Sequence, residues 1–183
     1  FENGADGEER QDRMVASGQL SARAMRRAVK SLAAVAFVSG LAAVGVALWN
    51  YDALLEGAGM IGLGVLAIWA AYRYTAGANP YGYRGLGDLM VLVFFGWVGV
   101  MGTAYLLSGT LRPEWLLPAT WCGLMSTAVL NLNNMRDHVK DEEAGKRTLV
   151  VAMGWERAKA YHAACFLVGW MAWWVFALWV EPD

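Results

Sequence analysis

The sequence predicts an all-α protein, a polytopic bundle with about five transmembrane helices, and three observations predict it. Of its 183 residues, 57% are hydrophobic, above the roughly 45–50% of ordinary globular domains. Charged residues crowd into a few stretches, and the apolar runs between them approach the roughly 20 residues that a membrane span needs. Lys and Arg are also concentrated in alternate connections. The net charge of −1 offers no basic field for nucleic acid.

The predicted spans are five apolar runs, which we assign to a single membrane domain covering residues 1–183. The fourth run is short, is interrupted by Pro118, and is expected to extend into the polar stretch after it. In order, the runs cover residues 32–49, about 54–72, 88–107, 115–130 and about 160–180.

The connections between these runs have their own signals. Ser21 is a good N-cap for a basic interfacial helix that leads into the first span. Glycines and Pro80 keep the stretch 73–87 irregular. Cys122 and Cys165 lie inside apolar runs and are expected to be small core residues without a disulfide.

The distribution of positive charge predicts the topology. With five spans, the stretches 1–31, 72–88 and 132–159 lie on one side of the membrane. They hold six, two and six Lys and Arg residues, and only Arg112 lies opposite. The positive-inside rule places these stretches in the cytoplasm and the protein in the cell membrane. We therefore expect a cytoplasmic loop with an interfacial helix at 1–31 and a cytoplasmic aspartate-rich loop at 132–159.

The strongest chemical signal is the stretch NLNNMRDHVKDEEAGKRT at 131–148. Asn133, Asp137 and Asp141 recur every four residues, which places them on one face of a helix. Their oxygen atoms suit a hard divalent cation, and Mg²⁺ is the ion we expect. Lys146 and Arg147 come next, within reach of an anion such as a diphosphate. The alternative interpretation is an ordinary solvated helix end.

Asp88 and four tyrosines have open interpretations. Asp88 begins a span, where the helix dipole favours an acid, and a catalytic role is the alternative. The tyrosines are either interfacial anchors or, for some of them, aromatic faces that stabilise a cation in a cavity; they are Tyr72, Tyr74, Tyr81 and Tyr83.

The stretch NNMRDHVKDEEAGKRTLVV resembles the second aspartate-rich motif of the UbiA-type intramembrane prenyltransferases. More specifically, it is similar to NNxRDxxxDxxxGKxT in the 1,4-dihydroxy-2-naphthoate polyprenyltransferases of menaquinone synthesis. The stretch YRYTAGANPYGYRGLGDLMVLVFFG resembles the loop between that branch's fourth and fifth helices. The opening FENGADGEERQDRMVASGQLSARAMRRA resembles the segment just after the family's first aspartate motif, NDxxDxxxGxD.

The resemblance also predicts that the chain is a fragment. Only Asp6 matches the end of the first motif, which would begin before Phe1. Both ends look cut, and no signal peptide or initiator Met is visible. Family members have nine helices, so this chain would hold the third to seventh.

The resemblance implies transfer of a polyprenyl group from its diphosphate to 1,4-dihydroxy-2-naphthoate, with loss of the ring carboxylate. It assigns Asn133, Asp137, Asp141 and Asp6 to the Mg²⁺ site, and Tyr72 and Asp88 to the aromatic acceptor. The diphosphate contacts it implies are Lys146, Arg147, Arg136, Arg13 and Arg10.

Three alternatives remain open from the sequence. One is another aromatic acceptor, such as a hydroxybenzoate, homogentisate or a chlorophyll precursor. Another is a transporter or a non-catalytic cation-binding bundle, although a transporter would place its ionisable residues near mid-bilayer. The third is an inactive fragment.

Overall fold

The computed structural model describes residues 14–15, 17–50, 54–76 and 80–180, with the side chains of Asn50 and Leu54 left aside. The chain divides into two compact units, 1–80 and 81–183. The described residues include five helices long and apolar enough to cross a membrane. Many of their large apolar side chains are exposed, as expected for helices whose solvent is lipid; Leu32, for example, is 68% exposed.

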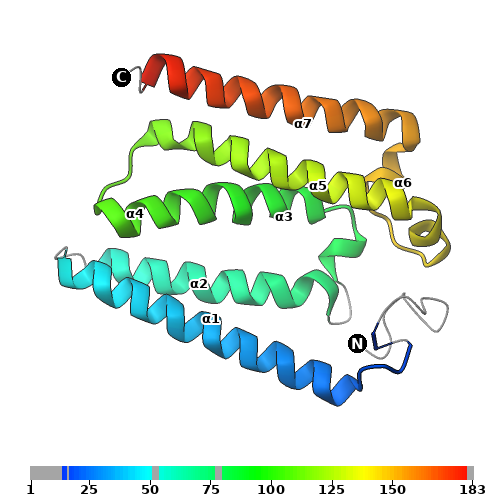
Figure 1. The fold of residues 1–183 in the computed structure, drawn as a ribbon, viewed down its shortest axis with the longest axis horizontal. Helices are drawn as coiled ribbons and strands as arrows, with labels where there is room; N and C mark the ends of the chain where they lie inside the picture. The colour runs from blue at the N-terminus through cyan, green and yellow to red at the C-terminus, as the bar shows by residue number, and fades with distance from the viewer. Residues whose placement is uncertain (1–13, 16, 51–53, 77–79, 181–183) are drawn as a thin grey trace. The chain divides into compact units, whose positions relative to one another are not determined.

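The first unit is a pair of packed helices, α1 (Ala22–Asn50) and α2 (Leu54–Thr75) (Figure 1). The expected cap at Ser21 is confirmed, because its Oγ accepts a hydrogen bond of 3.2 Å from the Ala24 N–H. The basic interfacial segment and the first apolar run form one uninterrupted helix.

The third span begins the second unit and changes its helical type partway. A 3₁₀ turn, η1 (Tyr81–Tyr83), precedes α3 (Gly87–Val91), the π-helix η2 (Leu92–Met101) and α4 (Gly102–Ser108). Gly96 lets this span approach α5 closely, because a Cβ there would lie 2.6 Å from the carbonyl oxygen of Ala119. Small residues commonly permit such close helix contacts in membranes.

The fourth span is α5 (Leu116–Glu143), which comes after the 3₁₀ turn η3 (Pro113–Trp115). It extends into the polar stretch, as the sequence predicted. The predicted interruption at Pro118 is wrong. Pro118 lies in the first helical turn, where a backbone N–H has no partner within the helix and its loss costs little.

The rest of the second unit is α6 (Leu149–Met153), α7 (Trp155–Val175) and the π-helical end η4 (Phe176–Val180). Most of the stretch 132–159, predicted as a loop, is therefore helical. The helix α5 packs between the third span and α7 (Figure 1). Met135, Val150 and Ala158 form a buried core that joins α5, α6 and α7. Both cysteines are free, as predicted.

Candidate active site at the end of α5

The C-terminus of α5 is closed by a Schellman motif. Gly145 has a φ of +69°, a conformation that glycine adopts without strain. The N–H of Lys146 donates to the Asp141 carbonyl over 2.8 Å, and that of Gly145 donates to the Glu142 carbonyl over 3.0 Å. This turn sends the chain back along the helix, so that Lys146 returns to the side of Asp141.

Asp141 and Lys146 form a buried ion pair. The Nζ atom of Lys146 lies 3.6 Å from Oδ1 of Asp141, and each side chain is 7% exposed. The same ammonium lies 4.7 Å from the centre of the Tyr83 ring, in a cation–π contact. Lys and Asp are rarely buried unless they are paired. Here the two partners lie only five residues apart in the sequence, on either side of the turn at Gly145.

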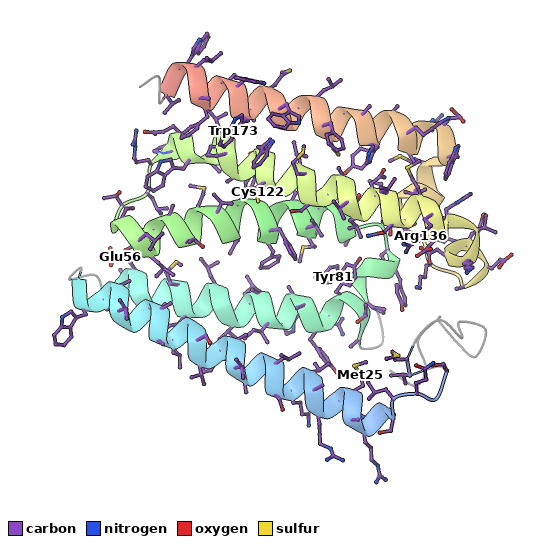
Figure 2. The ribbon with its side chains drawn as sticks, in the orientation of Figure 1. Met25, Glu56, Tyr81, Cys122, Arg136 and Trp173 are labelled. Carbon is purple, nitrogen blue, oxygen red and sulfur yellow. The ribbon has the colours of Figure 1, made fainter. Side chains whose placement is uncertain are left out.

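The loop that carries Tyr83 is attached to the connection after α5. The Arg147 N–H donates to the Tyr83 carbonyl over 2.9 Å. A Cβ on Gly85, which has a φ of +74°, would lie 3.3 Å from the Arg147 carbonyl oxygen. Burial raises the pKa of Tyr81 in the same loop, which keeps its hydroxyl neutral. Tyr81 and Arg136 lie at the same end of the second unit (Figure 2).

The other predicted metal ligands on α5 differ from Asp141 in exposure. Asn133 is exposed, Asp137 is half-buried and Asp141 is buried. Four residues advance a helix by about 40° beyond a full turn, which rotates each successive position toward the packed side. Arg136 donates from Nε and Nη2 to the two carboxylate oxygens of Asp137, each over 2.9 Å.

The donor chemistry of this helix end fits a hard cation in part. Asn133, Asp137 and Asp141 supply only oxygen ligands, the type that Mg²⁺ prefers. Both carboxylates, however, already contact basic side chains. No group of three or more His, Cys, Asp or Glu residues suited to a metal occurs among the described residues. These ligands would therefore make up only part of a site.

A second polar cluster lies inside the bundle. Asp88, in the first turn of α3, is 4% exposed, and its Oδ1 has no hydrogen-bond partner among the described residues. The Thr127 hydroxyl on α5 lies 3.3 Å from the Asp88 carbonyl oxygen. From α7, Tyr161 lies near the Asp88 carboxylate.

Asn131 lies one turn beyond Thr127 and is fully buried at 0% exposure. Neither atom of its side-chain amide has a hydrogen-bond partner within the described part of the chain. Buried polar atoms without partners are uncommon, and they often mark functional positions.

A family model of the UbiA prenyltransferase family matches residues 1–182. The chain belongs to this family. A relative in Escherichia coli (strain K12), 1,4-dihydroxy-2-naphthoate octaprenyltransferase, is 51% identical over 152 residues, covering 83% of this chain and 48% of the relative. A relative of the same name in Haemophilus influenzae is 41% identical over 179 residues, covering 97% of this chain and 57% of the relative.

More distant relatives include UbiA prenyltransferase domain-containing protein 1 of Gallus gallus, 35% identical over 85 residues, which cover 46% of this chain and 25% of the relative. No solved structure matches the chain. The chain spans about half the length of the relatives in Escherichia coli and Haemophilus influenzae. Family membership confirms the resemblance inferred from the aspartate-rich stretch.

The remaining predicted site residues are spread over the chain. Tyr72 lies on α2 in the first unit and is 53% exposed. Arg147 is exposed beside the buried Lys146. Asp6, Arg10 and Arg13 lie outside the described residues.

Two residues that neighbour the predicted ones, Asn131 and Tyr161, were not singled out from the sequence. Tyr83 was expected to be either an interfacial anchor or a ring face for a cation, and its ring lies 4.7 Å from the Lys146 ammonium. The available signal for Asn131 was a polar residue directly after an apolar run.

Proposed function

We propose that the protein of which this chain is part transfers a polyprenyl group from an allylic diphosphate to 1,4-dihydroxy-2-naphthoate. The observation that carries the proposal is the end of α5, where two carboxylates and two basic side chains converge at the edge of an apolar bundle. The relatives in Escherichia coli and Haemophilus influenzae bear the name of this activity at 51% and 41% identity.

Each charged residue has a proposed role. Asn133, Asp137, Asp141 and Asp6 would hold Mg²⁺, which when bound would neutralise charge on the leaving diphosphate. Lys146, Arg147 and Arg136, with Arg10 and Arg13, would contact the diphosphate oxygens. Arg is suited to this task because its planar fork binds phosphate through two parallel hydrogen bonds.

The apolar helices would provide the environment for the chemistry. The bond between the allylic carbon and the diphosphate oxygen breaks, and the electron-rich ring attacks the resulting cation. The ring carboxylate then leaves as CO₂, and the electrons of its bond restore the aromatic ring. The product is the hydroquinone form of demethylmenaquinone, and the quinone itself requires a separate two-electron oxidation. Apolar walls exclude water that would otherwise capture the cation. Tyr72 and Asp88 are the proposed residues near the acceptor.

The proposal places the protein in the cell membrane. The stretches 1–31, 72–88 and 132–159 would face the cytoplasm, because they hold all of the Lys and Arg residues except Arg112. Both substrates would then reach the site from the cytoplasmic side and the lipid bilayer.

The experiment uses the protein extended at both ends to the length of its relatives. Asp137→Ala and Asp141→Ala are each expected to lower Mg²⁺-dependent transfer to dihydroxynaphthoate by roughly a hundredfold or more, because electrostatic stabilisation of leaving charge is lost. Glu142→Ala and Glu143→Ala are matched controls, since these exposed acids end the same helix. Full activity in both Asp variants would refute the site assignment.

The acceptor is tested in the same assay. Dihydroxynaphthoate, 4-hydroxybenzoate and homogentisate are offered at equal concentration with one polyprenyl diphosphate. Preferential prenylation of dihydroxynaphthoate supports the proposed activity. Preference for another ring would move the protein to a different branch of the family.

A further inference from the structure

Lys146 contacts an anion and an aromatic ring at the place where a divalent cation is expected. Its ammonium contacts the Asp141 carboxylate on one side and the Tyr83 ring on the other. A carboxylate and an aromatic face both attract positive charge. Lys146 therefore occupies part of the space in which Asp141 would bind a metal ion.

The burial of this pair makes the competition energetically important. Both side chains are 7% exposed, so neither charge is well screened by water. A cation that binds Asp141 must displace the ammonium or share the carboxylate with it. An ammonium that loses this partner needs another anion or exposure to water.

We propose that Lys146 is the counter-ion of Asp141 in the metal-free protein. The divalent metal replaces the Lys146 ammonium at Asp141, and the ammonium then pairs with the diphosphate. This inference rests on the proposed function, which supplies the metal and the diphosphate. It assigns Lys146 a role beyond a diphosphate contact: it couples the two binding events. Metal alone binds weakly because Lys146 opposes it, and diphosphate favours metal by giving Lys146 a new anion.

The exchange requires a fixed backbone and a mobile ammonium, and the connection after α5 provides both. The Schellman turn at Gly145 fixes the start of the Lys146 side chain close to Asp141. Four flexible methylene groups then allow the ammonium to move while the backbone stays in place. Arg147 remains exposed beside it.

The first test measures the reactivity of the Lys146 amine in the unmodified extended protein. Acetylation by an amine reagent is measured by mass spectrometry in chelator, with Mn²⁺ alone, and with Mn²⁺ plus inorganic diphosphate. Lys146 is expected to be protected in chelator, labelled roughly tenfold faster with Mn²⁺ alone, and protected again when diphosphate is added. Lys140, exposed in the last turn of α5, should react equally in all three states.

The second test measures Mn²⁺ affinity by electron paramagnetic resonance. Lys146→Met keeps an unbranched side chain of similar length but removes the charge. It is expected to bind Mn²⁺ alone roughly tenfold more tightly than the wild type, and to gain less from added diphosphate. Lys140→Met removes the same charge from an exposed position nearby and controls for the general electrostatic effect.

The outcomes separate this inference from the proposed function. Protection of Lys146 in Mn²⁺ alone, or unchanged Mn²⁺ affinity in Lys146→Met, would overturn the exchange. Neither measurement involves prenyl transfer or an aromatic acceptor. A protein that shows the exchange but prenylates no dihydroxynaphthoate would refute the proposed activity alone.

Discussion

Two buried carboxylates at the same end of the second unit have opposite electrostatic surroundings. Asp141 is 5% exposed and paired with Lys146, whose ammonium also contacts Tyr83. Asp88 is 4% exposed, and its Oδ1 has no hydrogen-bond partner among the residues that the structure describes. One charge is compensated by a neighbour in sequence, and the other lies among neutral polar groups from two other helices.

The difference teaches how each site depends on the fold. The Asp141 pair is local, because five residues and one Schellman turn bring its partner back. The surroundings of Asp88 are assembled from Thr127 on α5 and Tyr161 on α7, and exist only when three helices pack. Substitutions should therefore have opposite effects on stability in the two regions.

The largest expected effect is at the compensated site. In the metal-free extended protein, Lys146→Met should destabilise the fold by about 3–5 kcal/mol, because it leaves a buried carboxylate without its ammonium. Thermal unfolding in detergent, monitored by tryptophan fluorescence, measures the change. Adding Asp141→Asn to the same variant should restore most of the loss, since neither charge then remains. Equal losses in the single and double variants would contradict the pairing.

An effect of opposite sign is expected at the uncompensated site. Asn131→Leu replaces a fully buried amide, unpartnered among the described residues, with an apolar side chain of similar size. It should stabilise the fold by roughly 1–3 kcal/mol, the usual cost of unmade buried hydrogen bonds. Ser126→Ala is the matched control on the same helix, because its hydroxyl already donates to the Cys122 carbonyl over 2.9 Å. A loss of stability in Asn131→Leu would show that the amide has a partner in the working protein.

The sequence was sufficient for features set by composition and local pattern. Apolar runs predicted the spans, Ser21 predicted the start of α1, and the four-residue spacing predicted that Asp137 and Asp141 share a helix. The burial of Lys146 depends on where the chain turns after Gly145 and on Tyr83, more than sixty residues earlier. Pairing across that distance is decided by packing, which spacing along one helix does not encode.

The π-helix at Leu92–Met101 shows the same limit within one span. Its hydrogen-bond register differs from that of the flanking α-helices, although the sequence predicts one continuous apolar span over residues 88–107. The close approach of Gly96 to Gly123 occurs in this segment. Apolar composition predicts that such a run crosses the membrane, whereas helical type depends on the neighbour it packs against.

The smallest expected effect is at Tyr83, whose ring contacts the Lys146 ammonium. Tyr83→Leu removes the aromatic face beneath the ammonium but keeps an apolar side chain, and should destabilise the metal-free protein by roughly 1–2 kcal/mol. Tyr83→Phe keeps the ring and tests the hydroxyl by itself, so a much smaller loss is expected. The same thermal unfolding assay compares both variants with Lys146→Met. If Tyr83→Phe cost as much as Tyr83→Leu, the hydroxyl and not the ring face would stabilise this end of the bundle, and the cation–π contact would contribute nothing measurable.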